Sequence, residues 1–119
     1  MQFDPMVPIW LQVMREMEVE IVTAQRPPGS KLPGGRETAL KYGINPNTAA
    51  RVYQELEKAG LCETRRGLGT FVTEDQDRIA AARERLAREA VDRCLRELER
   101  LGVKWEDAII KIKERKEFY

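Results

Sequence analysis

The chain has 119 residues, of which 42% are hydrophobic and 34% are charged, and its formal net charge is +1. These values are typical of one globular domain, or of a small domain with a short appendage, and they exclude a disordered chain. No apolar run approaches the roughly 20 residues that span a bilayer, and the N-terminus lacks the basic start and apolar core of a secretory signal. We therefore expect a cytoplasmic protein with no membrane partner.

Apolar side chains at every fourth position predict a first helix over residues 8–25. They are Ile9, Val13, Met17 and Ile21. This spacing gives a helix one broad apolar face, and Pro8 suits its first turn. Pro27 and Pro28 end the helix, because proline cannot continue the backbone hydrogen bonds. Residues 31–33 then predict a short extended segment with room for one or two strand residues.

A helix, a tight turn and a second helix follow, which is the helix-turn-helix arrangement. The first of these helices is predicted over residues 35–42 and ends at Gly43, a residue typical of helix ends. Asn45 is a good N-cap and Pro46 a good first residue, so the second helix is predicted over residues 46–59. The side chains expected in the core are Ala39, Leu40, Ala49, Val52, Tyr53, Leu56 and Ala59.

Two short β-prone runs, residues 61–65 and 70–73, predict a hairpin. Arg66-Gly67-Leu68-Gly69 separates them, and its glycines allow the positive φ angles of a tight turn. A basic hairpin directly after a helix-turn-helix is a wing. The expected fold is therefore mainly α, a winged helix-turn-helix with a small two-stranded wing over residues 1–75.

Helical patterning returns in residues 76–119 and predicts an appendage with helices over residues 77–101 and 105–116. A heptad-like seam runs along the first of them: Ala87, Val91, Cys94, Leu98 and Leu101. The side chains that the second helix is expected to bury are Trp105, Ile109 and Ile112. So short a helix cannot cover the whole seam, which predicts a homodimer joined through these helices. The alternative is a tail that folds back on its own winged domain.

Three polar side chains lie opposite the core face of the predicted helix over residues 46–59: Asn47, Thr48 and Arg51. When such a helix enters the major groove of double-stranded DNA, Asn pairs with adenine, Arg with guanine, and the Thr methyl group contacts that of thymine. The alternative is that Asn47 and Thr48 only satisfy first-turn amides and that Arg51 is a surface charge.

Basic residues gather around the same elements. Residues 31–70 carry seven basic and four acidic side chains, whereas residues 71–119 carry twelve of each. Arg36 begins a helix, where a cation is unfavourable for the helix dipole, so we expect it to face a phosphate or a groove edge rather than Glu37. The wing residues expected to approach DNA are Arg65, Arg66, Gly67 and Gly69.

Catalytic and metal-binding chemistry lacks candidates. The chain has no His, and its only Ser, Ser30, lies in a Pro-Gly turn with no base beside it in sequence. Two cysteines without histidine cannot form a zinc site, so we expect Cys62 and Cys94 to be reduced and mostly buried thiols. We predict no enzyme, no catalytic residue, no metal and no cofactor.

Three stretches resemble the GntR family of bacterial transcription regulators. They are residues 32–39, the run that begins Asn45-Pro46-Asn47-Thr48, and residues 63–72 with their R-G-x-G-T-F-V ending. The match covers about residues 4–73, and the short two-helix tail is similar to that of the YtrA-like subfamily. The DNA-contacting positions that the resemblance implies are Arg36, Asn47, Thr48, Arg51 and Gly69, with Arg65 and Arg66 on the wing.

The resemblance also implies a dimeric repressor that binds a palindromic operator, in the setting of a transporter operon. We expect any small-molecule effector, whose identity the sequence does not give, to act at the dimer interface, because the tail is too short to enclose a pocket within one chain. Two other functions compete with this one. One is a winged helix used only for protein contacts; the other is the N-terminal part of an aminotransferase-like enzyme, which a chain ending at Tyr119 disfavours.

This chain departs from the family pattern at a few positions. Gly34 and Gly35 stand where the family usually has Ser and an apolar residue, which removes a helix N-cap and loosens the start of the helix that carries Arg36. Thr38 replaces a usual Leu and is expected to trim the local core. None of these positions belongs to the expected base-reading set.

Overall fold

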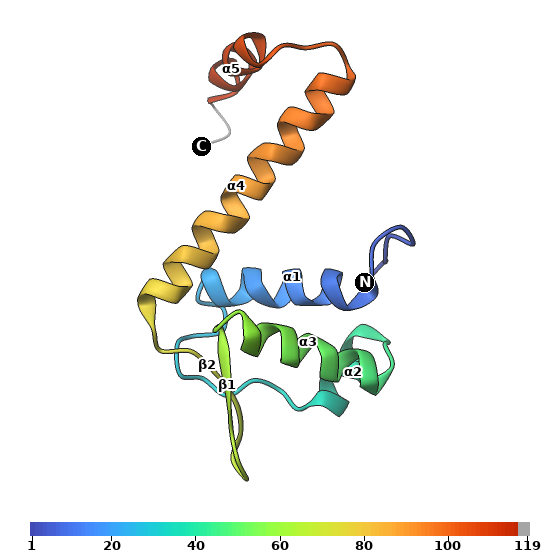
Figure 1. Ribbon diagram of the computed structural model, residues 1–119, viewed down its shortest axis with the longest axis vertical. Coiled ribbons are helices and arrows are strands. Elements are labelled where there is room, and N and C mark those ends of the chain that lie inside the picture. Colours follow the sequence, from blue (N-terminus) through green and yellow to red (C-terminus); the bar gives the residue numbers. More distant parts are fainter. Residues whose placement is uncertain (117–119) are drawn as a thin grey trace. The chain divides into compact units, whose positions relative to one another are not determined.

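The computed structural model describes residues 1–116 (Figure 1). The chain forms two compact units, Met1–Arg83 and Glu84–Tyr119. The elements of the described residues are α1 (Ile9–Val22), α2 (Gly35–Tyr42), α3 (Pro46–Lys58), β1 (Cys62–Arg65), β2 (Gly69–Val72), α4 (Gln76–Arg100) and α5 (Trp105–Glu114). The mainly helical fold with a small two-stranded wing is confirmed. The first turns of α4, predicted to be part of the appendage, belong to the first unit through Arg83.

The first helix is shorter than the predicted range. It begins at Ile9 and ends at Val22, and Ala24 takes a left-handed conformation with φ of 61°. The Thr23 hydroxyl donates a hydrogen bond to the carbonyl oxygen of Val19 at 2.7 Å, which satisfies an acceptor at the helix end. The chain therefore leaves the helix before Pro27 is reached.

The core of the first unit lies where α1, α2 and α3 pack together. Its fully or nearly buried side chains include Val13, Met17, Ile21, Leu32, Ala39, Ala49, Val52, Leu56, Leu61, Val72 and Ile79.

The prediction that Leu40 lies in the core is wrong, because this side chain is 85% exposed. Thr38 takes the inward position instead and is 1% exposed. Two residues along a helix turn the side chain to nearly the opposite side, so Thr38 and Leu40 cannot both face the core. Ala59, at the C-cap of α3, is also exposed, contrary to expectation.

The wing is an antiparallel pair in which Cys62 faces Val72 and Arg65 faces Gly69. A third strand position flanks it, because Lys31 forms an isolated bridge with Phe71. The amide of Leu32 donates to the Thr70 carbonyl, and the amide of Val72 donates to the Ser30 carbonyl, each at 2.8 Å. The short extended segment predicted at residues 31–33 is therefore confirmed, and it anchors β2 from the second side.

The second unit consists of the rest of α4, a turn through Gly102 and α5. The prediction that α5 buries its large apolar side chains is wrong for the single chain: Trp105 is 63% exposed, Ile109 41% and Ile112 59%. Only Ala108 is buried on this helix, at 1% exposure. Because α4 and α5 share few contacts, most of the apolar surface of α5 stays uncovered.

Two further observations concern residues 1–116. No helix in this range is both long and apolar enough to cross a membrane. Nor does this range hold a group of three or more side chains arranged to bind a metal ion.

The two cysteines differ in their surroundings. Cys62 is 4% exposed and its thiol lies 3.9 Å from the Tyr53 carbonyl oxygen, as expected for a buried thiol. Cys94 is exposed in the single chain, so the prediction of a buried thiol is wrong there. The described residues of the second unit leave this face of α4 open to solvent.

Burial should make Cys62 unreactive in the folded protein. Desolvation, with a smaller contribution from Glu57, raises the pKa of Cys62 to about 12, so the reactive thiolate is absent at pH 8. We expect a thiol reagent at pH 8 to leave the Cys62 peptide unmodified in the native protein and to modify it fully in guanidinium chloride. Peptide mass spectrometry measures both. Rapid native modification of Cys62 would contradict the burial of β1 against α3.

Candidate nucleic-acid interface

The start of α3 is fixed by local capping. The side chain of Asn45, in an extended conformation, accepts a hydrogen bond from the amide of Asn47 at 2.8 Å, and Pro46 fills the first helical position. This is the N-cap arrangement that the sequence predicts. Since Asn45 supplies the cap, the side chain of Asn47 is not the one that satisfies the first-turn amide, and it is exposed.

One face of α3 is buried and the opposite face is open to solvent. Ala49, Val52 and Leu56 are each 0% exposed and face the core. The exposed outward positions are Asn47, Ala50, Arg51 and Gln54, whereas Thr48 is half-buried at the edge of this face. The predicted Asn47 and Arg51 thus share one accessible helix face, and Thr48 borders it.

Arg51 has two partners in the first unit. Its guanidinium carbon lies 4.5 Å from the centre of the Trp10 ring on α1, and its Nε lies 3.8 Å from Oε1 of Glu55, one turn further along α3. The side chain is nevertheless 55% exposed. An arginine stacked in this way is ordered without being removed from solvent.

Arg36 lies in the first turn of α2 and is exposed. The N-cap of α2, Gly34, makes no side-chain capping hydrogen bond, as the sequence predicts. At the other end Gly43 takes φ of 65°, a conformation that glycine adopts without strain, and this closes the tight turn into α3. Arg36 at the start of α2 and Asn47 at the start of α3 therefore belong to the same compact unit.

A polar contact between side chains joins α2 to α3. The hydroxyl of Tyr53 donates to the carbonyl oxygen of Pro33, and the buried Thr38 hydroxyl lies 2.8 Å from the Tyr53 hydroxyl. Since the Tyr53 proton is used on Pro33, Thr38 is the donor in the second bond. Thr38 therefore does more than trim the core: it joins α2, α3 and the segment before α2.

The wing arginines have different environments. Arg65 pairs with Glu63 at 2.9 Å and stacks on Phe71, with its guanidinium carbon 4.4 Å from the ring centre. Arg66 is exposed at the turn, next to Gly67 with φ of 78°. Figure 1 shows that the hairpin extends away from the helices of this unit. Both arginines are exposed, but Arg65 is held by Glu63 and Phe71, whereas Arg66 lies in the turn at the tip.

Sequence reasoning missed Lys31 and Gln54 as candidates. Lys31 is exposed and crosses the wing so closely that a Cβ atom on Gly69, where φ is 120°, would lie 2.6 Å from its Cε. The bridge between Lys31 and Phe71, which the structure shows and no sequence motif signals, places this cation beside the wing. Gln54 lies two turns beyond Asn47 on the outward face of α3, and helical spacing alone would have found it.

Known proteins share this architecture. Residues 10–72 match the model of the family described as bacterial regulatory proteins, gntR family. The uncharacterized HTH-type transcriptional regulator YhcF of Bacillus subtilis is 37% identical over 94% of this chain and 93% of its own length. The HTH-type transcriptional repressor YtrA of the same organism is 41% identical, over 62% of this chain and 58% of its length.

The likeness extends to a solved structure. A GntR family transcriptional regulator from Listeria monocytogenes has 36% sequence identity and a TM-score of 0.84, covering 94% of this chain and 98% of its own. The family consists of DNA-binding regulators and not of enzymes. The chain belongs to the GntR family of transcriptional regulators, with a relationship to its YtrA-like members.

Proposed function

We propose that this DNA-binding regulator is a repressor that acts as a homodimer on a palindromic operator in the cytoplasm. The observation that carries the proposal is the polar outward face of α3 beside an exposed basic wing, both within the unit Met1–Arg83. A recognition helix reads only a few base pairs, so useful specificity requires two half-sites related by a two-fold axis. The proposal of repression rather than activation rests on the similarity to YtrA, which is a transcriptional repressor.

The proposed DNA contacts are of two kinds, recognition of base edges and binding of the phosphate backbone. Asn47 and Arg51 read base edges from the exposed face of α3, and Thr48 contacts a methyl group or a phosphate from its border. Arg36 and Arg66 hold the phosphate backbone or enter the minor groove. Gly67 and Gly69 allow the wing backbone to approach DNA closely, and Arg65 supports the wing from its contact with Phe71.

The second unit supports dimerisation through its uncovered apolar side chains. Within the predicted seam, Val91 is 57% and Leu101 69% exposed, Ala87 and Cys94 are exposed, and Leu98 is half-buried. The other large apolar side chains that this unit exposes are Leu95, Trp105, Ile109, Ile110 and Ile112. So many exposed apolar residues on one small unit indicate a surface that another protein surface covers. We assign it to a second copy of this chain.

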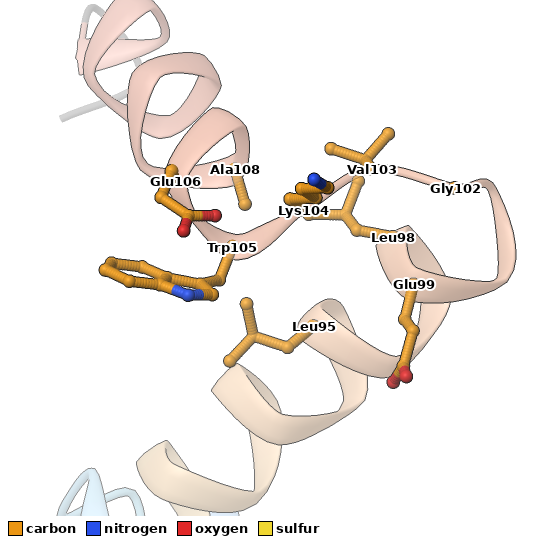
Figure 2. A pocket seen from close by; sticks show the side chains of 9 residues that line it. All are labelled: Leu95, Leu98, Glu99, Gly102, Val103, Lys104, Trp105, Glu106 and Ala108. Atoms are coloured by element: carbon orange, nitrogen blue, oxygen red, sulfur yellow. The ribbon is translucent and has the colours of Figure 1, made fainter.

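A hollow of about 570 Å³ lies between the end of α4 and the start of α5 (Figure 2). The hollow is open to solvent, so it does not contradict the expectation that the tail is too short to enclose a pocket within one chain. Its apolar wall includes Leu95, Leu98 and Trp105, and Figure 2 shows the Trp105 ring beside Leu95. In our proposal the partner's helices close this hollow, and any small-molecule signal acts there by altering the dimer.

Selection of bound fragments from a random DNA pool tests the proposal. A homodimer should enrich two inverted copies of one short motif at a fixed spacing. The genomic position of the matching site then shows whether the regulated genes encode a transporter, as the resemblance to the YtrA-like subfamily implies. Enrichment of a single unrepeated motif would contradict the dimeric operator, and no enrichment at all would favour the protein-contact alternative.

Arg51 and Arg66 should respond differently to truncation. We expect Arg51→Ala to cost about 1–3 kcal/mol of operator affinity and to relax the preference at one base position. Arg66→Ala should weaken all DNA binding uniformly and reduce the salt slope of the affinity by about one. Fluorescence anisotropy with operator and scrambled duplexes at several salt concentrations separates the two. An Arg51→Ala protein with unchanged affinity and specificity would remove Arg51 from the reading set.

A further inference from the structure

The contact between Arg51 and Trp10 crosses two helices that have different expected roles. Trp10 lies in the first turn of α1, half-buried, whereas Arg51 lies on the exposed face of α3. The distance of 4.5 Å from guanidinium carbon to ring centre is within the range of a cation–π contact. Helix α1 thus reaches the outward face of α3 through one aromatic ring.

The two partners of Arg51 act on different parts of its side chain. Trp10 contacts the flat face of the guanidinium, and Glu55 lies nearest to Nε, at 3.8 Å, which is longer than a hydrogen bond. In the part of the chain that the structure describes, no hydrogen bond engages the terminal nitrogens of Arg51. The edge of the guanidinium that would pair with a guanine is therefore free, while the face is supported.

Glu55 competes with this arrangement. Its carboxylate lies between Arg51 and Lys58, which is 3.5 Å away, so it attracts cations toward the α3 surface. Without the aromatic ring, Glu55 would be the remaining partner of Arg51 among residues 1–116, and a closer pairing would engage the nitrogens needed for base reading. A long side chain free to adopt several rotamers would also lose more entropy on binding DNA.

We propose that Trp10 is a positioning residue for DNA reading: its indole face holds the Arg51 guanidinium away from Glu55 and in a conformation ready to meet a base edge. The inference rests on the proposed reading role of Arg51. It assigns to α1, otherwise a core helix, an indirect part in sequence specificity.

The test compares three substitutions at position 10 for operator and scrambled DNA. We expect Trp10→Ala to lower operator affinity about three- to thirty-fold and to leave binding to scrambled DNA nearly unchanged. Trp10→Phe keeps an aromatic face and should restore most of the loss. Trp10→Leu keeps apolar volume without that face and should not. Thermal unfolding of each variant measures the packing contribution separately.

A double-mutant cycle supplies the decisive readout. In the Arg51→Ala background, Trp10→Ala should have almost no further effect on operator affinity, because the side chain that it positions is gone. Glu55→Gln removes a negative charge and should raise DNA affinity in any background. The positioning role predicts a larger gain in the Trp10→Ala background than in the wild type, whereas a purely structural role of Trp10 predicts equal gains.

The failures of the two proposals are distinguishable. If Arg51→Ala itself leaves operator binding unchanged, the reading role of Arg51 is wrong. If Arg51→Ala weakens binding but Trp10→Ala does not, or if Trp10→Ala strengthens it, only the positioning role is overturned. Equal recovery by Trp10→Leu and Trp10→Phe would also overturn it, because the ring would then serve as apolar filling alone.

Discussion

Replacement of Val91 by aspartate is expected to convert the protein to a monomer and to lower operator affinity by about 10²- to 10⁴-fold. Val91 is 57% exposed in the single chain, so the new carboxylate meets water in the monomer and leaves the fold intact. In a dimer joined along α4, the same carboxylate would be buried without a partner, which costs several kcal/mol. Loss of the dimer removes the simultaneous binding of two half-sites.

The control must separate a broken interface from a change of charge. Arg96→Gln lowers the net charge by one, as Val91→Asp does, but Arg96 lies five positions along α4 and so on the opposite face of the helix. Sedimentation at micromolar concentration should find Arg96→Gln dimeric and Val91→Asp monomeric, with the same melting transition for the winged domain. A monomeric wild type that still binds a palindromic site tightly would defeat the proposed dimer, and a Val91→Asp protein with an unfolded winged domain would support a tail that folds back.

The elements of the winged domain were predictable because their signals are local. Asn45 and Pro46 mark a helix start through capping chemistry that needs no tertiary contact, and Gly43 marks an end for the same reason. The hairpin likewise follows from Gly67 and Gly69, whose φ values of 78° and 120° suit few other residues. The spacing of apolar residues, together with the caps and the turn glycines, was therefore enough to locate α2, α3 and the wing in the sequence.

It was less predictable which side of a short or isolated helix is buried. An eight-residue helix such as α2 presents too few apolar residues to define its phase, so the pattern favours Leu40 for the core position that Thr38 occupies. For α5 the pattern predicts burial of Trp105, Ile109 and Ile112, which the single chain leaves exposed, because a pattern does not say which surface covers an apolar face. Cys94 is exposed for a similar reason: its heptad position predicts burial but does not say against which surface.

Within the candidate site, the sequence predicted which side chains are basic or polar but not how they are held. Arg65 and Arg66 are adjacent in sequence, yet only the structure shows that the first stacks on Phe71 and that the second is exposed at the turn. The contact of Arg51 with Trp10 joins residues 41 positions apart, a distance that no local pattern reports. Contacts between elements therefore decide the differences among residues of the same type.

The hydroxyl of Tyr53 is such a contact between elements, and its removal should be costly. Tyr53→Phe leaves two polar groups without their partner, the carbonyl of Pro33 and the hydroxyl of the buried Thr38. An unsatisfied buried polar group costs about 1–3 kcal/mol, so we expect this order of loss in the free energy of unfolding. Thr38→Val should cost less, because the Tyr53 hydroxyl keeps its bond to Pro33 and a valine needs no partner. Urea unfolding measures both.

The same hydroxyl should give the variant a different dependence on pH. Burial raises the pKa of Tyr53 above its ordinary value of 10.0, although the hydrogen bond from Thr38 opposes the shift. A raised pKa in the folded state means that the neutral hydroxyl stabilises the fold fully below pH 10.0 and that this stability is lost as the pH rises through the raised pKa. Tyr53→Phe has no proton to lose there, so its stability should fall less steeply than that of the wild type above pH 10.0. If the two proteins have equal stability at pH 7 and parallel alkaline profiles, the hydroxyl of Tyr53 does not stabilise the packing of α2 against α3.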